Sequence, residues 1–469
     1  MATCLPIDNA AASAGSAAAR FARLRGVRLV HCEDLDTWPG QLPERSMIAI
    51  SASRLWELSA GLKRHLAHLV GEGATLYVRG VAQRRATLDL APFAPGALAI
   101  ACERRAVGYR FTASRMLPAV LAHEEVVGGV FEAPGVERLN PPAEALLTVR
   151  HVDGAERAAI FALRYGRGSA IYDLHPEAHP KDEARADAPL VARLARQEVR
   201  HREVGALVAA NCAAGIEPSR LPPFNLMVDD RPVNFDHFNA APVSALLRHI
   251  DDLRPGAHTD FAWTPCHTSP CRGYLEAMKG FSTGFVWHGL WRHVDHRAIS
   301  HPAAELAQGK RMVSRIERRF GLRLQPIMIF PFERSAPEQF PLLVEAGFRA
   351  SVEEPRPRSG CDARLPGYLA YSLPARAETA CGFTVLYRYP AASLARDRML
   401  AMAALGLPIL ACAHPEDVGL RRFSRFWDRG GEVSHFDEVL NFASSKGLPS
   451  RSLEDIAAEV GEGRAADHR

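Results

Sequence analysis

The sequence predicts an α/β protein of two domains, an open and mostly parallel sheet followed by a distorted (β/α) barrel. The chain has 469 residues, which is long for a single hydrophobic core. Short β-rich runs alternate with helical runs in both halves, as in sheets covered by helices. A polar stretch from Pro180 to Pro223 interrupts this alternation. We therefore expect a flexible tail at 1–24, a first domain at 25–180, a helical linker at 181–221 and a second domain at 222–469.

The first domain contains apolar runs that favour buried strands. These runs predict strands at 27–32, 46–52, 75–80, 145–152, 158–166 and 169–177. Apolar residues at helical spacing predict an amphipathic helix over 54–73, which ends in glycine. Strands that alternate with helices indicate an open sheet, most of it parallel.

The second domain repeats the alternation with better-defined units. Strands are predicted at 226–230, 259–265, 284–289, 326–332, 348–354, 384–390 and 408–415, and helices at 242–250, 273–279, 303–321, 338–347 and 393–406. In barrel-like α/β folds the carboxyl ends of the strands surround one mouth. Residues that follow different strands are therefore expected to meet there.

Composition is that of an ordinary globular protein, with 47% hydrophobic and 23% charged residues. The 57 basic and 53 acidic residues leave a net charge of +4, which is too small to indicate nucleic acid or an anionic membrane as a partner. No apolar run approaches the roughly 18 residues of a membrane span, and the start of the chain does not resemble a secretory signal. The nine cysteines are dispersed, which suits a reducing compartment. We expect a cytoplasmic protein.

Acidic and imidazole side chains follow several predicted strands of the second domain. They are Asp229, Asp230, His288, His293, His296 and His414. A carboxylate with two imidazoles is a common ligand set for a catalytic Zn²⁺ that keeps one position open for water. The alternatives are an aspartate pair that caps a turn and histidines that are exposed or hydrogen-bonded. We favour metal-assisted hydrolysis because the group recurs at strand ends.

Two cysteines flank a histidine in a second, weaker pattern. Cys266, His267 and Cys271 could hold a structural Zn²⁺, but no second cysteine pair accompanies them. Loop thiols near the barrel mouth are the favoured interpretation, with His267 as a candidate pocket residue.

From residue 222 the chain resembles the polysaccharide deacetylases, carbohydrate esterase family four, in a divergent form. The resemblance covers about half of the chain. It implies a general base at Asp229, metal ligands at Asp230, His288 and His293, with His296 as a substitute, and a proton donor to the leaving amine at His414. The segment PIMIFPFER is similar to the family's aromatic motif near the site, which makes Arg334 a candidate to orient the base.

This chain departs from the family pattern at two positions. His288 and His293 lie five residues apart where the family uses four, so that the loop must bulge or His296 must substitute. Arg231 stands where a glycine usually follows the aspartate pair. A guanidinium there narrows the room for a sugar ring and offers a cation to an acidic substrate.

The first domain resembles the class I glutamine amidotransferase-like fold, a flavodoxin-like open sheet. His175, Pro176 and Glu177 are similar to that family's catalytic His-Pro-Glu, but Gly80 and Val81 stand where the nucleophilic cysteine would be. Without a thiolate no covalent acyl intermediate can form. We expect a non-catalytic scaffold, lid or partner-binding domain.

These expectations combine into a metal-dependent hydrolase, with Zn²⁺ as the expected ion, that removes an acetyl or other acyl group from an amide nitrogen. The expected substrate is a small or carrier-linked N-acylated sugar. The alternatives are hydrolysis of a non-sugar amide and a catalytically silent carbohydrate-binding or regulatory protein. No nucleic-acid partner and no membrane span are expected, while a homo-oligomer or a protein partner could form through the first domain.

Overall fold

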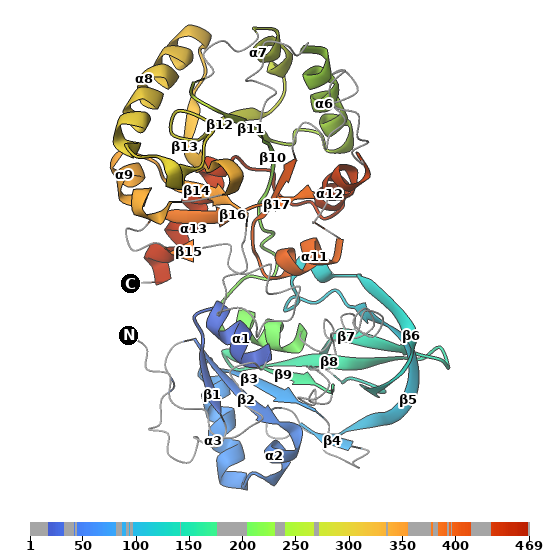
Figure 1. Ribbon diagram of the computed structural model, residues 1–469. Helices are drawn as coiled ribbons and strands as arrows, with labels where there is room; N and C mark the ends of the chain where they lie inside the picture. Colours follow the sequence, from blue (N-terminus) through green and yellow to red (C-terminus); the bar gives the residue numbers. More distant parts are fainter. Residues whose placement is uncertain are drawn as a thin grey trace. The chain divides into compact units, whose positions relative to one another are not determined.

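The computed structural model divides the chain into two compact units, Met1–Arg220 and Leu221–Arg469, and each is described by itself (Figure 1). The structure describes residues 17–31, 42, 45–80, 87–90, 93, 97–140, 142–175, 204–229, 240–266, 272–333, 336–354, 377–378, 383–391, 394, 396–413 and 433–467. Strands and helices occur in both units, so the α/β class is confirmed.

Unit 1 begins with a parallel half-sheet. Its strands are β1 (Arg28–His31), β2 (Ser46–Ser51), β3 (Thr75–Arg79) and β9 (Gly168–Asp173), paired in that order. The predicted helix over 54–73 is in fact two helices, α2 (Ala52–Glu57) and α3 (Ala60–Gly71). Leu58 and Ser59 are extended between them, and the Ser59 hydroxyl accepts a hydrogen bond from the N–H of Leu62. The hydroxyl thus starts α3 as an N-cap.

The other half of this sheet is antiparallel. Its strands are β4 (Thr87–Asp89), β5 (Ala97–Phe111), β6 (Glu125–Val136), β7 (Glu144–His151) and β8 (Glu156–Tyr165), with the short helix η2 (Ala119–Leu121) between β5 and β6. The sheet order is β1-β2-β3-β9-β8-β6-β5-β4, and β7 pairs with β5 and β8. Gly166, at φ +57°, lies in the short turn from β8 to β9. Connections this short allow only antiparallel pairing, so the prediction of a mostly parallel sheet is wrong for these strands.

Two helices of unit 1 lie in segments that the sequence assigns to the tail and the linker. Helix α1 (Ala17–Leu24) belongs to the predicted tail, yet Phe21 and Ala22 are buried. A second helix at 204–213 belongs to the predicted linker and is also mostly buried. The Nε atom of Arg25 donates to the Oδ1 atom of Asn211 over 2.8 Å. Small apolar side chains let both helices pack closely, and both belong to unit 1, which ends at Arg220. The predicted boundary at 181 lies outside the described residues.

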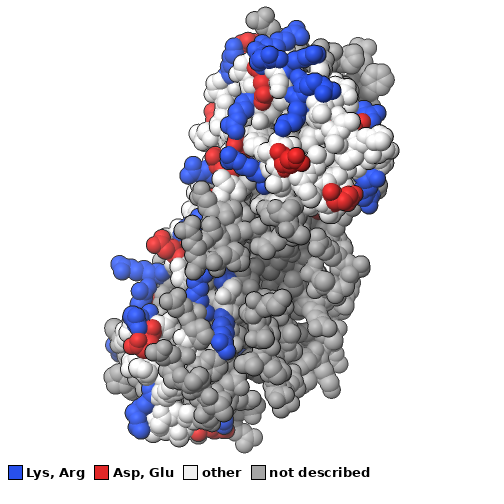
Figure 2. Space-filling model, turned by 90° about the vertical axis from the view of Figure 1, so that its left-hand side faces the viewer, with Lys and Arg blue, Asp and Glu red and all other residues white. Residues whose placement is uncertain are grey.

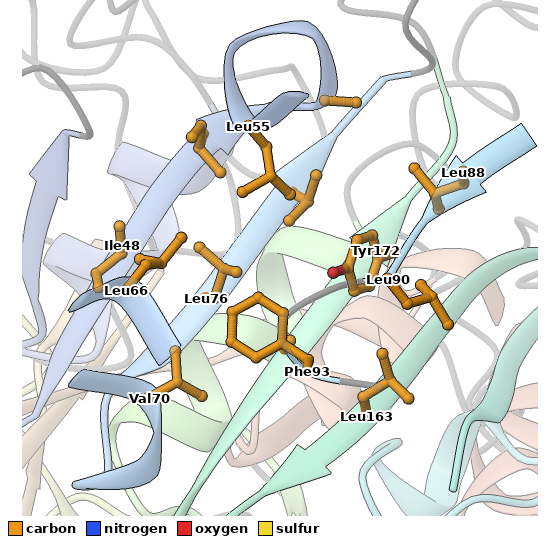
Figure 3. Close-up of a cluster of buried hydrophobic side chains, with 14 of the residues drawn as sticks. Ile48, Leu55, Leu66, Val70, Leu76, Leu88, Leu90, Phe93, Leu163 and Tyr172 are labelled. Carbon is orange, nitrogen blue, oxygen red and sulfur yellow. The ribbon is translucent and has the colours of Figure 1, made fainter. Parts of the chain in front are cut away.

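The core of unit 1 forms where α2 and α3 cover the sheet (Figure 3). Leu66 and Val70 of α3 are fully buried with Leu76 of β3 and Ile48 of β2. From the other side of the cluster, Phe93 contacts Tyr165 edge to face, with ring centroids 5.5 Å apart. The parallel and antiparallel halves therefore share one hydrophobic core.

Unit 2 is built on a sheet whose strands are parallel except at one edge. The strands are β10 (Phe224–Val228), β11 (Thr259–Trp263), β12 (Thr283–His288), β13 (Leu324–Ile329), β14 (Ala350–Glu353), β15 (Ala377–Glu378), β16 (Thr384–Tyr387), β17 (Tyr389–Pro390) and β18 (Ile409–Ala413). Their order is β15-β16-β14-β13-β12-β11-β10-β18-β17, and only β15 runs antiparallel to its neighbour.

The sheet of unit 2 curls into a barrel. Strand β16 pairs with β14 near one edge, and β17 pairs with β18 at the other. Only Arg388 separates β16 from β17 in the chain. β16 and β17 thus lie near opposite ends of the strand order. They can follow each other directly in the chain only if the sheet closes so that its two edges come together. The predicted barrel is therefore present, and Arg388 lies at its seam.

Helices pack around the strands of the barrel (Figure 1). They are α6 (Ala240–Leu253), α7 (Arg272–Met278), α8 (Pro302–Phe320), α9 (Phe340–Glu345), α11 (Arg396–Ala404), α12 (Val433–Ser445) and α13 (Leu453–Asp467), with the short helices η3 (His296–Ala298), η4 (Pro331–Glu333) and η5 (Pro337–Gln339). Among the described residues, no helix is both long enough and apolar enough to cross a bilayer.

A buried carboxylate organises the amino-terminal end of the barrel, which we call the barrel bottom. Asp260 of β11 is fully buried and accepts hydrogen bonds from the side-chain amides of Asn225 and Gln325. Its Oδ2 atom also accepts the N–H of Leu453 over 3.0 Å, and its Oδ1 atom lies 3.0 Å from the Nε2 atom of His258. Three strands and the start of α13 are thereby joined through one side chain.

Candidate active site

The candidate site lies at the other end of the barrel, the mouth, where the parallel strands finish. Asp229 directly follows β10, and His288 is the last residue of β12. The N–H of Asp229 donates to the carbonyl of Ala413 at the end of β18 over 2.9 Å. Because β10, β11 and β12 are parallel neighbours, the side chains that follow β10 and β12 meet at one rim. Asp229 and His288 therefore lie side by side at this rim, and the roles expected for them stay predictions.

Asp229 is held between two buried basic groups. Its Oδ1 atom lies 3.1 Å from the Nδ1 atom of His288, and its Oδ2 atom accepts from the Nη2 atom of Arg388 over 2.5 Å. The three residues are 3%, 2% and 1% exposed. A guanidinium stays protonated at all physiological pH values, so its contact favours the ionised form of the Asp229 carboxylate. The site therefore holds a fixed, oriented carboxylate away from bulk water.

Arg388 is the functional candidate that the sequence analysis missed. It reaches Asp229 from the seam of the barrel, and its Nη1 atom also lies 3.4 Å from the Sδ atom of Met227. The only signal in the sequence is a lone cation inside the apolar run TVLYRYP. Arg334, the predicted orienting residue, lies outside the described residues.

His296 presents one ring nitrogen with a lone pair. The Nε2 atom of Gln339 donates to the carbonyl of His296 over 2.9 Å, which turns the Gln339 Oε1 atom toward the His296 ring, 3.1 Å from Nδ1. An amide oxygen only accepts, so Nδ1 carries the proton and Nε2 carries the lone pair. His296 Nε2 is buried and has no hydrogen-bond partner within the described part of the chain.

The surroundings of His296 keep its ring neutral. The residue is fully buried, and the ring of Phe330 contacts it edge to face at 4.7 Å between centroids. Burial lowers the pKa of His296 to about 4, although the hydrogen bond with Gln339 opposes the shift. A neutral imidazole is the form that binds a metal ion.

His293 stacks on His288. The ring centroids are 4.7 Å apart and the ring planes differ by 13°. Since a metal ion lies near the plane of each imidazole that binds it, two stacked rings do not direct their lone pairs to one point. Phe332 covers His293 edge to face at 4.8 Å and is itself 58% exposed.

Two backbone positions shape this rim. Gly289 has a φ of +84°, and a Cβ atom there would lie 2.6 Å from the carbonyl oxygen of Arg292. Only glycine fits such a turn, which brings the loop with His293 back over His288. Phe332 has a φ of +59°, a conformation that bulky residues rarely adopt and that is common at functional sites.

The structure brings four of the predicted site residues into this region, namely Asp229, His288, His293 and His296. Asp230, Arg231, His267, Cys271, Arg334 and His414 lie outside the described residues. Within the described ranges, no group of three or more His, Cys, Asp and Glu side chains is arranged to hold a metal ion. Cys266 is partly buried, which raises its pKa, so its thiol is a poor metal ligand as it stands.

Unit 1 contains a separate buried cluster around His175. Its Nδ1 atom lies 2.7 Å from Asp173 Oδ1, and its Nε2 atom lies 3.2 Å from the Tyr109 hydroxyl. The Tyr77 hydroxyl donates to Asp173 Oδ2 over 3.0 Å. Gly80 follows β3 with a φ of +85°, while Pro176 and Glu177 lie outside the described residues. The contacts join β3, β5 and β9, as a structural cluster does.

Comparison with known proteins gives a limited result. No protein-family model matches the sequence, and no curated protein matches it. Polysaccharide deacetylases are among the solved structures that resemble about half of the chain.

A peptidoglycan deacetylase from Bacillus subtilis has 14% identity and a TM-score of 0.31, over 53% of this chain and 95% of that one. A family 4 carbohydrate esterase from Streptomyces lividans, in complex with acetate, has 11% identity and a TM-score of 0.31, over 50% and 93%. A 4-α-glucanotransferase from Thermococcus litoralis has 14% identity and a TM-score of 0.34, over 51% and 40%. Likeness of this size establishes neither a family nor an activity.

Proposed function

We propose that unit 2 is a metal-dependent hydrolase that removes an acyl group from an amide nitrogen. The observation that carries the proposal is the meeting of Asp229 and His288 at the barrel mouth, with 3.1 Å between Oδ1 and Nδ1. The contact is a close ion-pair distance and not an aligned hydrogen bond. A carboxylate beside one ring nitrogen of a histidine is the usual arrangement where the other ring nitrogen binds a metal. Asp229 would thus both fix His288 and act as a base.

The side chains present fit a divalent ion such as Zn²⁺. His288 would use its Nε2 atom, because its Nδ1 atom faces Asp229. His296 would supply the second imidazole, since its Nε2 atom carries the lone pair. Asp230 would complete the set, as the sequence resemblance implies. His293, the ligand that the sequence resemblance implies, becomes the alternative to His296 and would need a rotation of its ring away from His288.

In the proposed reaction each of the remaining residues has a distinct role. A bound Zn²⁺ polarises an acyl oxygen and lowers the pKa of water. Asp229 accepts the proton of the attacking water, and Arg388 holds the carboxylate in place while that proton moves. His414 donates a proton to the departing nitrogen, as the resemblance implies. The buried surroundings of Asp229 and His288 limit the access of bulk water to these transfers.

The proposed substrate is an N-acetylated or otherwise N-acylated sugar, free or carrier-linked. This choice follows from the sequence resemblance and from the exposed ring of Phe332 at the rim, because an aromatic face suits the apolar face of a sugar ring. Unit 1 is proposed as a non-catalytic domain of the glutamine amidotransferase-like type, since Gly80 stands in place of its nucleophile.

The experiment combines metal analysis with release of acetate from N-acetylhexosamine substrates. We expect bound metal and acetate release for the native protein, and loss of both for His288→Ala. His301→Ala is the matched control, because His301 is an exposed histidine of the same unit. Metal without acetate release would point to a non-sugar amide. A protein that binds no metal when supplied with it would favour the silent carbohydrate-binding protein instead.

A further inference from the structure

Helix α8 carries a row of arginines on the side that faces away from the barrel. Leu306, Val313 and Ile316 are buried against the sheet. Arg311, Arg315, Arg318 and Arg319 are all exposed, and their spacing of four, three and one residues places them within about 100° of one another around the helix. We call these four residues the arginine row. It spans the nine residues 311–319, about 12 Å along the helix axis.

The charges of the arginine row are not compensated. No ion pair joins these four arginines to a carboxylate within the described residues. The two acidic residues of α8 are engaged elsewhere, since Glu305 pairs with Arg292 and Glu317 accepts the N–H of Leu324. Figure 2 shows Lys and Arg side chains gathered on this face of unit 2, over α8. The small net charge of the whole chain therefore conceals a local concentration of positive charge.

The position of the arginine row separates it from the candidate active site. Helix α8 begins after the loop that carries His296 and ends before β13, so it runs from the mouth of the barrel toward the bottom. The arginines occupy the half that is nearer the bottom. A partner on this surface would leave the mouth open for substrate.

We propose that the arginine row docks the protein reversibly on an anionic phospholipid bilayer. Guanidinium groups bind phosphate in a bidentate manner, and a convex helix meets a planar layer of phosphates along its length. The other positions on this face are Ser314 and the upstream Gln308 and Ala304, while Met312 at its margin is only partly exposed and contacts Arg315. Contact is confined to the headgroups and is sensitive to salt.

A bilayer suits the surface better than nucleic acid. The exposed face of α8 offers no aromatic ring for stacking on bases, because Phe320 is partly buried and lies under the guanidinium of Arg319, 5.1 Å away.

The test is co-sedimentation of the full chain with vesicles at low salt. One set contains phosphatidylcholine alone, and the other contains phosphatidylglycerol as about one third of the lipid, enough to give a negative surface. We expect binding only to the anionic vesicles, lost as salt is raised. Replacing all four arginines by Gln should weaken binding by roughly 600-fold, since each charge contributes about fivefold. Gln keeps the helix propensity, and circular dichroism checks the fold.

The control removes four other exposed charges from unit 1, by Arg64→Gln, Arg105→Gln, Arg138→Gln and Arg150→Gln. This variant should bind the vesicles like the native protein. Equal losses in both variants would show that net charge alone is responsible, and unchanged binding of the arginine-row variant would locate the contact elsewhere. Either result overturns the proposal, as does duplex DNA that binds more tightly than the vesicles at the same salt. The readout does not depend on catalysis, so it stands apart from the proposed hydrolase.

Discussion

The two ends of the barrel in unit 2 each bury one aspartate, and the two carboxylates have different partners. At the bottom, Asp260 accepts from two side-chain amides and a backbone N–H. At the mouth, Asp229 faces the guanidinium of Arg388 and the imidazole of His288. Asp260 also lies 3.0 Å from the imidazole of His258, so the partner that sets Asp229 apart is the guanidinium of Arg388, a permanent cation that favours an ionised carboxylate. Burial alone therefore does not distinguish structure from function, but the partners do.

The largest expected effect is on activity at the mouth. Asp229→Asn should lower acetate release from N-acetylhexosamine by about 10³-fold or more, since general base catalysis is lost. The variant should also be less stable, because it removes the charge of the carboxylate that the buried Arg388 contacts. Steady-state rates and urea unfolding measure the two effects.

The double variant Asp229→Asn with Arg388→Met separates these effects. An apolar side chain in place of a buried ion should restore most of the stability, while the rate stays low. Recovery of the rate in the double variant would contradict the role of Asp229 as the base.

At the bottom the expected effect is on stability. Asp260→Asn should lower the free energy of unfolding by about 3 kcal/mol, because buried donors lose their acceptor. The rate per folded molecule should stay within about twofold of the native value, since the site is at the other end of the barrel. Urea unfolding combined with active-site titration would show this. A drop in rate without a drop in stability would tie Asp260 to the chemistry.

A third expected effect is sensitivity to acid at the mouth. The pKa of His296 is about 4 in the folded protein and about 6.5 when unfolded. Because the unfolded chain binds the proton more readily, stability should be complete above pH 6.5 and decline as the pH falls toward 4, by at most about 3 kcal/mol.

Urea unfolding in chelator between pH 7 and 4 would show this dependence. His296→Gln removes the titrating ring and should flatten this part of the profile. An identical profile in that variant would mean that other groups cause the acid sensitivity.

The smallest expected effect concerns an exposed ion pair near the bottom. Arg323 donates to Glu454 over 2.8 Å, and Arg349 lies 3.5 Å from the same carboxylate. Arg323→Gln should lower the free energy of unfolding by less than about 1 kcal/mol, since exposed ion pairs contribute little. Arg349 would still pair with Glu454. Thermal unfolding at low and high salt would show it. A decrease in the free energy of unfolding as large as that of Asp260→Asn would contradict the expectation that a buried carboxylate contributes more to stability than an exposed ion pair.

The sequence predicts the barrel of unit 2 well because its signals are local. Apolar runs that end in Asp229 or His288 mark both the strands and the mouth, and Gly289 marks the turn after β12. Arg388 could not be predicted, because its meeting with Asp229 depends on how the sheet closes. The closure brings together β16 and β17, which lie near opposite ends of the strand order. No local sequence pattern predicts such a contact.

Unit 1 was predicted less well for related reasons. The strands β5 and β6 are long, contain register shifts and mix charged with apolar residues, so they show no clean alternation. Helix α1 is short and rich in alanine, and burial of Phe21 stabilises it. Non-local pairing and burial decide these elements.

The most direct test of the central claim is the zinc content of the purified chain. Mass spectrometry of the native protein, of His288→Ala and of His301→Ala after exposure to Zn²⁺ and removal of the excess would provide it. The account predicts one tightly bound ion in the native protein and in His301→Ala, and none in His288→Ala. A native protein that retains no ion, or a His288→Ala variant that retains it fully, would contradict the account.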